Sequence, residues 1–298
     1  MLVFVTAIKH PNNSANFRRV EQLLEISLRS ICSQTDPEFR VVVVCNVKPQ
    51  VAFDDDRIVY HSVDYPAPAS KGQTAVAYNA YVRDKGTKLL AGALLGQQFK
   101  PDYFGMVDSD DLVSRRLVAF ANANIGKAGW YTDAGYVVNY KTWRTQRKYG
   151  LVRYCGTALV PNAADLFRLC KIDKSLDHNA KQQDLLDAVS PTLVDHLFGD
   201  HPYMAGFFAK HGLYMKPVPF RASAWVLENG ENQTPLREKA SGLPVSEWFC
   251  QEFGVCNPPH AHNSSSLLDR LHELFSTGIS KLGSLRYRVK GFPDLPQS

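Results

Sequence analysis

A run of four consecutive valines, Val41 to Val44, constrains the fold of this chain more than any other feature. An unbroken run of β-branched residues is typical of a strand that is buried on both faces, as in a parallel sheet. An apolar run at 2–8 and a stretch with helical spacing of apolar residues at 17–33 come before it. Strand, helix and strand in this order predict a right-handed βαβ unit. We therefore expect an α/β fold built on a mostly parallel sheet.

Further strand and helix signals follow along the chain. We expect a weaker strand at 57–61, a helix from near Gly72, and a short strand at 102–107 that runs directly into acidic residues. In open α/β sheets ligands bind outside the carboxyl ends of the strands, so the acidic residues are expected at a site of chemistry. Beyond residue 130 we expect strands and loops to about residue 160, helices near 161–170, 181–198 and 201–211, and strand-like segments at 213–217 and 219–227.

The character of the chain changes after residue 232, where prolines interrupt it before an amphipathic segment at 265–282. We therefore expect a main domain at 1–232 and a C-terminal helical extension at 233–298. The apolar residues of this segment recur at helical intervals, and they are Leu267, Leu268, Leu271, Leu274, Phe275 and Ile279. One interpretation is a helix packed back on the domain. The other is a peripheral membrane contact or a contact between subunits, favoured by the basic residues Lys281, Arg286, Arg288 and Lys290.

Composition restricts the class of partner and the compartment. The chain has 298 residues, a hydrophobic fraction of 45% and a net charge of +5. Its Lys and Arg residues form no long basic run, which favours a phosphate-bearing small molecule or an anionic lipid surface over a nucleic acid. The six cysteines are widely spaced, and no segment approaches the roughly 20 apolar residues that cross a bilayer. We expect a cytoplasmic protein, with any membrane association peripheral and on the inner face.

The cluster Asp108-Ser109-Asp110-Asp111 is the clearest chemical feature of the sequence. Three carboxylates in four positions repel one another unless a cation or solvent relieves the charge. A hard divalent ion such as Mg²⁺ or Mn²⁺ takes oxygen ligands and leaves positions open for diphosphate oxygens. The cluster therefore predicts a site for a metal-bound nucleotide. The alternative is a solvated acidic turn that caps a helix beginning at Leu112.

Several segments, in order, resemble the glycosyltransferases of family two, which have the GT-A fold. The first similar segment is 24–35, followed by the valine run, and the next is the pair Gly72 and Asn79. The later ones are the Asp-x-Asp pattern of Asp108 and Asp110 and the segment of Gly156 with Ala158-Leu159-Val160. It covers about residues 2–230 with gaps. It implies a GT-A fold with helices flanking a mostly parallel central sheet. It also implies a metal-dependent, hexosyltransferase-like enzyme that moves a sugar from a nucleotide diphosphate donor to an acceptor hydroxyl, with inversion.

The resemblance implies roles for the residues around the donor. Asp108 would face the ribose, Asp110 would coordinate the Mn²⁺ or Mg²⁺ that bridges the donor phosphates, and Asp111 would be a further donor-site acid or a structural one. The donor-binding residues that we expect are Thr6, Ala7, Ile8, His10, Asn46, Lys71, Gly72, Asn79, Asp108 and Ser109. The alternative to donor binding is a solvated lysine for Lys71 and a plain loop residue for His10. Asn46 stands where the family has acids, and it can still hydrogen-bond a pyrimidine edge, so a UDP-sugar is favoured.

The chain departs from the family where the general base is expected. Gly199-Asp200-His201 falls at the place of a Glu-Asp pair whose aspartate is the base. By position His201 replaces that aspartate and Asp200 the glutamate, and either side chain can take a proton at neutral pH. The alternative for Asp200 is the cap of a helix that has Pro202 in its first turn.

The sequence offers a further ligand for this metal ion and one separate candidate metal site. Many GT-A enzymes add a late histidine to the metal, and here Glu228 or Asn232 would supply an oxygen instead, although both are ordinary turn residues. The metal ligands that we expect are thus Asp108, Asp110, Glu228 and Asn232. The residue types of Cys250, Cys256, His260 and His262 suit zinc, but their spacing matches no standard zinc motif, and core thiols with surface histidines are the preferred interpretation.

Other functions fit the sequence less well. A phosphatase would need a nucleophilic aspartate after an early strand, and a nucleotidyltransferase a glycine-rich loop, whereas residues 7–16 contain no glycine. A non-catalytic GT-A-fold module for binding or assembly is the second hypothesis, because the base and the second-strand acids both deviate. The partners that we expect are a nucleotide sugar and a glycan, lipid-linked or small-molecule acceptor. The sequence leaves open whether the chain forms an oligomer.

Overall fold

The computed structural model of the chain describes residues 1–69, 75–232, 242–255 and 267–296. Within these residues, the larger of two sheets has seven strands in the order β10-β6-β9-β4-β1-β2-β3. Their bounds are Leu2–Ala7 (β1), Phe39–Cys45 (β2), Ile58–Ser62 (β3), Tyr103–Asp108 (β4), Gly129–Tyr131 (β6), Leu159–Pro161 (β9) and Lys216–Pro217 (β10). β1 lies between β4 and β2 and pairs in parallel with both, and β2 pairs in parallel with β3. The expected α/β class with a mostly parallel central sheet is confirmed.

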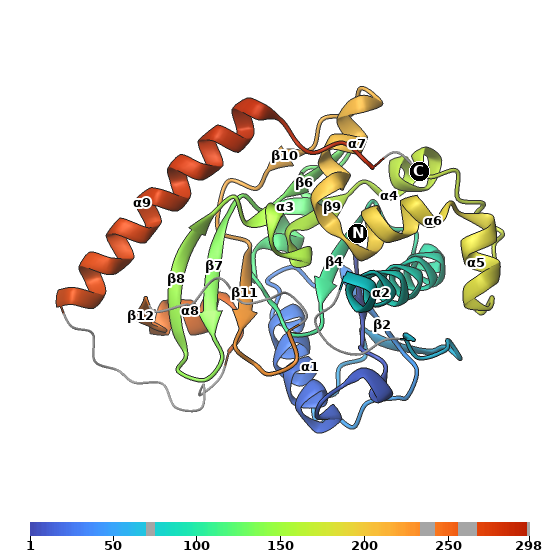
Figure 1. Cartoon of the computed structure of the whole chain (residues 1–298), viewed down its shortest axis with the longest axis horizontal. Coiled ribbons are helices and arrows are strands. Elements are labelled where there is room, and N and C mark those ends of the chain that lie inside the picture. Colours follow the sequence, from blue (N-terminus) through green and yellow to red (C-terminus); the bar gives the residue numbers. More distant parts are fainter. Residues whose placement is uncertain (70–74, 233–241, 256–266, 297–298) are drawn as a thin grey trace.

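Helices cover both faces of this sheet (Figure 1). α1 (Phe17–Cys32) packs on one face and α2 (Ala75–Gly96) on the other. Successive side chains of a strand point to opposite faces, so neighbouring residues of β1 belong to different cores. Val5 packs in one cluster with Leu89 of α2, and Phe4 packs in the other with Leu24 of α1. The valine run of β2 is divided between the two clusters in the same way, which explains why it is apolar throughout.

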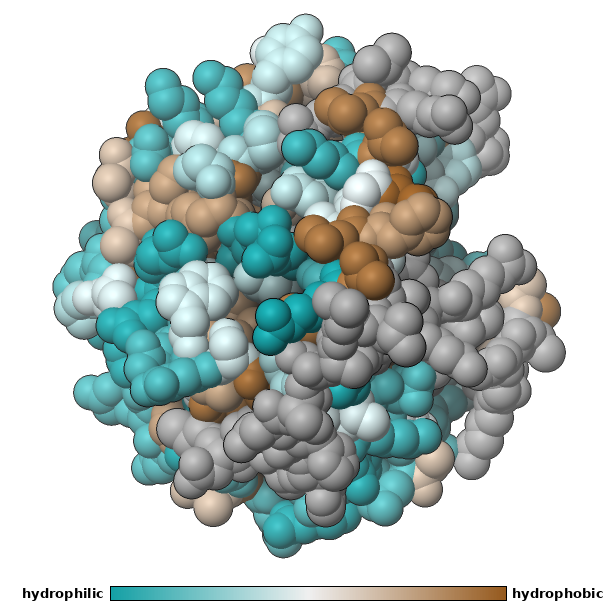
Figure 2. Space-filling model, turned by 90° about the vertical axis from the view of Figure 1, so that its left-hand side faces the viewer, coloured by the Kyte–Doolittle hydropathy of each residue, from teal (hydrophilic) through white to brown (hydrophobic). Residues whose placement is uncertain are grey.

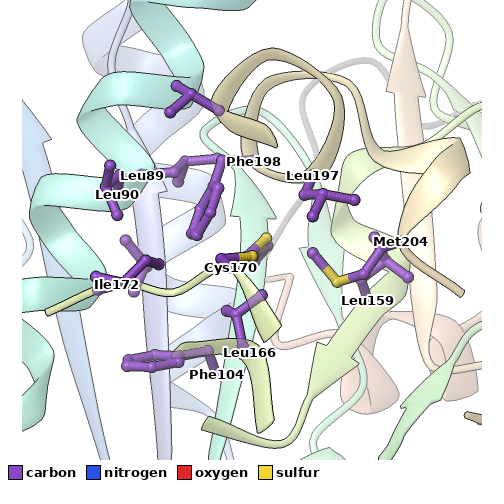
Figure 3. Close-up of a cluster of buried hydrophobic side chains, with 14 of the residues drawn as sticks. Leu89, Leu90, Phe104, Leu159, Leu166, Cys170, Ile172, Leu197, Phe198 and Met204 are labelled. Atoms are coloured by element: carbon purple, nitrogen blue, oxygen red, sulfur yellow. The ribbon is translucent and has the colours of Figure 1, made fainter. Parts of the chain in front are cut away.

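Glycines allow α2 to lie close to the elements beneath it. A Cβ at Gly92 would come within 2.4 Å of Val5 Cγ1 in β1. A Cβ at Gly86 would come within 2.5 Å of the carbonyl oxygen of Val194, which begins the π-helical turn η5 (Val194–Gly199). Figure 3 shows the core that results, in which Leu89 and Leu90 of α2 lie with Phe198 of η5 and Phe104 of β4.

The smaller sheet has five strands within the described residues, in the order β12-β8-β7-β11-β5. Their bounds are Leu112–Val113 (β5), Ala134–Asn139 (β7), Arg144–Tyr149 (β8), Ser223–Leu227 (β11) and Leu243–Pro244 (β12). The core of this sheet contains Val226 together with Phe249 of α8 (Glu247–Glu252) and Phe253. The segment 242–255 therefore packs against the smaller sheet, and the division of the chain at residue 232 stays a prediction.

The remaining elements are short, apart from α9 (Leu267–Lys290), which runs beside β8 (Figure 1). They are η1 (Pro11–Asn13), η2 (Gln97–Phe99), α3 (Leu117–Asn122), η3 (Leu151–Arg153), η4 (Gly156–Ala158), α4 (Ala163–Leu169), α5 (Gln182–Ala188), α6 (Pro191–Leu193), η6 (His201–Tyr203) and α7 (Met204–Lys210). The single helix expected over 181–198 is wrong, because Val189 is extended and Pro191 starts a new helix. None of the described helices is long and apolar enough to cross a membrane.

The close approach of α2 and η5 can be tested with Gly199→Ala. The new Cβ would lie 2.2 Å from the carbonyl oxygen of Val82, so we expect the free energy of unfolding to fall by about 1–3 kcal/mol. Gly278→Ala is the matched control, because Gly278 lies in α9 with nothing within 4 Å of its Cβ, and this change should stabilise the helix by about 0.5–1 kcal/mol. Urea unfolding measures both variants. Equal stability of the two would contradict the packing described here.

Candidate functional site

The acidic cluster lies where the carboxyl ends of the central strands meet. β1 and β4 are parallel with Ala7 in register with Asp108, so the loops after both strands begin at the same edge of the sheet. Asp108 is the last residue of β4, and the chain turns back at once, with the N–H of Asp111 donating to the carbonyl of Asp108 at 3.0 Å. This turn gives each of the three carboxylates different partners.

Asp108 forms an ion pair with Lys85, which reaches it from α2. Burial opposes the charge of both side chains, but their attraction outweighs it, so the pKa of Asp108 is lowered and the pKa of Lys85 is raised. The backbone N–H of Gly156 also donates to the Asp108 carboxylate. A Cβ at Gly156 would lie 2.8 Å from Asp108 Oδ2, so glycine is needed for this close approach.

Asp110 is surrounded by amides. Its Oδ2 accepts hydrogen bonds from Asn229 Nδ2 at 2.7 Å and from Asn232 Nδ2 at 3.2 Å. Burial, together with the charge of Asp108, raises the pKa of Asp110 to about 6. At neutral pH this carboxylate is therefore ionised in surroundings that disfavour its charge, and a bound cation would relieve that cost.

Asp111 has a structural role. It is 1% exposed and accepts hydrogen bonds from the Val226 N–H at 2.9 Å, the Thr157 hydroxyl at 2.7 Å and the Cys155 thiol at 3.1 Å. Burial and the neighbouring carboxylates raise its pKa well above the ordinary value. Of the two roles left open by the sequence, the structural one fits these contacts. The capped helix from Leu112 is wrong, because Leu112 begins the buried strand β5.

Asp108 and Asp110 line a cavity of about 80 Å³ together with the predicted base residues. The other residues of its walls are Tyr78, Tyr81, Val82, Lys85, Tyr154, Gly199, Asp200, His201, Trp225, Leu227, Glu231 and Asn232. The rings of Tyr154 and Trp225 are stacked, with centroids 6.0 Å apart and planes 16° from parallel. The acids after β4 and the Asp200-His201 pair, which are far apart in the sequence, therefore share one cavity.

The two candidate bases differ in their surroundings. Burial raises the pKa of Asp200, although Lys85, His196 and a hydrogen bond from Tyr78 oppose the rise. Its side chain makes no capping hydrogen bond to η6, so the helix-cap interpretation is wrong. Burial and then the charge of Lys85 lower the pKa of His201 to about 3. Within the described residues, the buried Nε2 of His201 has no hydrogen-bond partner. His201 is therefore neutral at physiological pH.

The residues expected to line the nucleotide lie at the ends of β1 and β2. Thr6 and Ile8 are buried, and the carbonyl of Ile8 accepts a hydrogen bond from Lys88 Nζ at 2.9 Å. Lys88 is itself fully buried and pairs with Asp84 of the same helix at 2.7 Å. Ala7 is half-buried at the end of β1. This buried pair fixes the backbone that follows β1, directly before His10.

His10 and Asn46 have local partners. His10 Nδ1 accepts from the Asn12 N–H at 3.1 Å, and burial, followed by the charge of Lys88, lowers its pKa. Asn46 Nδ2 donates to the carbonyl of Tyr65 at 2.9 Å, and its buried Oδ1 has no partner within the described part of the chain. Asn46 therefore keeps one acceptor to offer.

The other expected donor and zinc residues are placed as follows. Asn79 is exposed on the first turns of α2, and Ser109 is half-buried in the turn between the acids. Lys71 and Gly72 lie outside the described residues. Cys250 lies in α8, whereas Cys256, His260 and His262 also fall outside the described residues. The zinc interpretation therefore stays untested.

The four expected metal ligands do not come together. Glu228 lines a different cavity of about 950 Å³ between α1 and the turn 228–231, and its Oε2 lies 4.0 Å from Lys141 Nζ. Asn232 does meet Asp110, but as a donor, while its own Oδ1 accepts from the Asn229 N–H at 3.2 Å. Within the described residues, no group of three or more His, Cys, Asp or Glu side chains is arranged to hold a metal ion. Of the four, Asp108, Asp110 and Asn232 line one cavity, and Asn232 meets Asp110 through its amide N–H and not through its oxygen.

Sequence reasoning missed several residues of this site. Lys85 lies in a largely buried helix, on the same side as Tyr78 and Tyr81, and their spacing of three and four residues is the signal that could have revealed it. Glu231 was also missed. Its carboxylate binds Lys9 at 3.0 Å and the Asn16 N–H at 2.7 Å, and so fixes the loop after β1. No local pattern distinguishes Glu231 from the neighbouring turn residues.

Comparisons with known proteins find structural likenesses only. No family model matches the chain, and no curated protein does. Residues 1–349 of S. aureus TarS match with a TM-score of 0.38 and 11% identity, over 76% of this chain and 60% of that structure. TarS in complex with UDP-GlcNAc matches with a TM-score of 0.35 and 13% identity, over 84% and 63%. The 2-C-methyl-D-erythritol 4-phosphate cytidylyltransferase of Francisella tularensis matches with a TM-score of 0.41 and 12% identity, over 79% and 95%.

The chain thus spans less than two thirds of the TarS structures that it matches. All three TM-scores lie below 0.5, so function has to be inferred from the chain's own residues. Its topology, with parallel β3, β2, β1 and β4, antiparallel β9 and acids directly after β4, is the mostly parallel α/β arrangement expected from the sequence.

The raised pKa of Asp110 predicts a pH-dependent effect of Asp110→Asn. Its folded pKa of about 6 lies above the ordinary 3.8, so the wild-type protein loses stability as the pH rises between these values. Without divalent ions, Asp110→Asn should therefore gain roughly 3 kcal/mol over wild type between about pH 4 and pH 7. Thermal unfolding measures this difference. Asp187→Asn, at an exposed acid of α5, is the control, and the same pH trend in both variants would contradict the account of Asp110.

Proposed function

We propose that the protein is a glycosyltransferase that moves a sugar from a nucleotide diphosphate donor, with a UDP-sugar favoured, to an acceptor hydroxyl. One observation carries this proposal: Asp108 and Asp110 share a cavity with Lys85 and Asp200 at the carboxyl edge of the central sheet. Transfer from such a donor requires positive charge beside the departing diphosphate and a base beside the acceptor. The cavity holds candidates for both.

A divalent cation fits this cavity if the donor completes its coordination. Mg²⁺ is commonly held by one or two carboxylates together with substrate phosphates and water, so the two carboxylates that the described residues bring to the cavity are enough. Asp110 is the better ligand, because burial and Asp108 disfavour its charge when no cation is present. Asp108 would be the second ligand, shared with Lys85. When bound, such an ion would neutralise charge on the departing diphosphate.

Lys85 has two roles in this proposal, one toward the donor phosphates and one toward Asp108. Its ammonium group lies beside Asp108 with a raised pKa, so it stays charged at neutral pH. A fixed cation in a buried site stabilises an anionic leaving group without reorganisation during the reaction. Lys85 would therefore hold the donor phosphates on the side of α2 and keep Asp108 oriented.

Asp200 is the better candidate for the general base. A carboxylate whose pKa is raised by burial accepts a proton more readily than an imidazole whose pKa is about 3. Asp200 would take the proton of the acceptor hydroxyl as that oxygen attacks the anomeric carbon. A single displacement of this kind inverts the configuration. The stacked rings of Tyr154 and Trp225 in the same cavity offer an apolar surface to a sugar ring.

Donor binding is tested by calorimetry with UDP and Mn²⁺. Wild type should bind UDP only with Mn²⁺ or Mg²⁺, and Asp110→Ala should lose this binding while staying folded, because it removes the main ligand of the cation. Asp187→Ala provides the control at an exposed acid. UDP binding of equal affinity with and without Mn²⁺, in wild type and in Asp110→Ala, would remove the metal from the proposal.

Base assignment is tested by the rate of UDP release from a UDP-sugar, with water in place of the acceptor. Asp200→Asn should lower this rate by roughly a hundredfold and leave UDP affinity within a few-fold, because only proton transfer is lost. His201→Ala should have a smaller effect on the rate. Unchanged rates in both variants would exclude this pair from the reaction, and a greater loss in His201→Ala would move the base to His201.

A further inference from the structure

The long helix α9 packs on the protein through its polar side. Glu273 and Ser284 are 7% and 3% exposed. Glu273 Oε1 accepts from the Arg147 N–H at 3.0 Å, and the Ser284 hydroxyl donates to Asp133 Oδ1 at 2.8 Å. Ser280 lies between them and accepts from the Tyr149 N–H at 3.3 Å. A helix in water usually buries its apolar side, so this orientation is the reverse of the ordinary one.

The apolar side of α9 faces outward. Six large hydrophobic residues of this helix are 49–72% exposed, namely Leu271, Leu274, Phe275, Ile279, Leu282 and Leu285. At 3.6 residues per turn they cover a face about 140° wide. Figure 2 looks at the side of the molecule where α9 lies, and hydrophobic residues gather there in a band. An exposed apolar surface of this kind marks a site of interaction.

The chain after α9 holds the helix in this orientation. Phe292 contacts the ring of Tyr131 with centroids 5.1 Å apart, and Asp294 pairs with Lys210 of α7 at 3.0 Å. Phe292 and Leu295 pack against the main core. A rotation of α9 that buried its apolar side would break these contacts. It would also break the three hydrogen bonds that α9 makes with Arg147, Tyr149 and Asp133.

The exposed charges among the described side chains of α9 are positive. Among the described side chains of α9, the exposed residues include Arg270 and Lys281 and no acid, since Glu273 is turned inward. The whole helix has five basic residues and two acidic ones, with Arg286, Arg288 and Lys290 in its last turns. An apolar face bordered by basic residues suits a surface that is apolar inside and anionic outside.

We propose that α9 lies in the surface of a membrane that contains anionic lipids, with Phe275 and its neighbours among the acyl chains and with Arg270 and Lys281 at the headgroups. The width of the apolar face favours a surface over a single partner helix, which needs a narrower seam. Pairing of two copies through this face would also bring basic residues together without an acid among the described side chains to balance them. The cavity of the proposed enzyme plays no part in this contact.

Vesicle flotation of the full-length protein tests this proposal. Wild type should float with phosphatidylcholine vesicles that contain about 30% phosphatidylglycerol, and at least about tenfold less with phosphatidylcholine alone. The double variant Phe275→Ser/Leu282→Ser should bind the anionic vesicles at least about tenfold more weakly, because two apolar side chains leave the interface. Tyr214→Ser is the matched control, because Tyr214 is 70% exposed and lies outside α9. Circular dichroism checks that each variant is folded.

Three results would overturn the proposal. The first is a folded wild-type protein that fails to float with the anionic vesicles. The second is a Phe275→Ser/Leu282→Ser variant that floats as well as the Tyr214→Ser control. The third is a wild-type dimer in light scattering that this double variant splits, with no vesicle binding, which would assign the apolar face to a second copy of the chain.

Discussion

The buried carboxylate of Asp111 joins the two sheets, and the orientation of the other acids depends on it. It accepts from the backbone of β11 in the smaller sheet and from Thr157 and Cys155 in the segment that leads to β9 of the larger one. The Thr157 hydroxyl also accepts from the Asp108 N–H at 2.9 Å, so one network holds both ends of the acidic turn. A buried carboxylate is costly unless its hydrogen bonds are kept, and this cost restrains the turn to one arrangement. The positions of Asp108 and Asp110 in the cavity are therefore fixed by the buried hydrogen bonds of Asp111 and Thr157.

The central strands were predictable from sequence because their signals are local. The valine run of β2, the helical spacing of α1 and the strand that ends at Asp108 each follow from the order of apolar residues alone. The smaller sheet was not predictable in the same way. β8 has the polar sequence Arg144–Tyr149, which gives no apolar alternation, and its pairing with the neighbouring strand β7 defines it. β5 has only two residues and is defined by hydrogen bonds to the distant strand β11, so no periodicity reveals it.

The same contrast holds for the site. Asp108 and Asp110 were identified because carboxylates that lie close together in the sequence repel one another, which predicts a bound cation. Their different roles depend on partners from other elements, Lys85 of α2 and Asn229 after β11, which the sequence cannot bring together. α9 shows a related limit, because periodicity predicts an amphipathic helix but not which of its sides faces the protein. In this chain the hydrogen bonds of Glu273 and Ser284 decide that question.

The proposed function requires that the cavity at the carboxyl edge of the sheet binds a nucleotide sugar and transfers its sugar. In the proposed function, Asp108, Asp110, Lys85 and Asp200 would all act on one bond, the one between the sugar and the diphosphate. The most direct measurement is therefore UDP release by the wild-type protein from a panel of UDP-sugars, with Mn²⁺ and with a chelator. We expect slow release of UDP from at least one UDP-sugar with Mn²⁺ and none with the chelator. Binding of a UDP-sugar without any release would contradict it, and would identify the chain as a non-catalytic binding module.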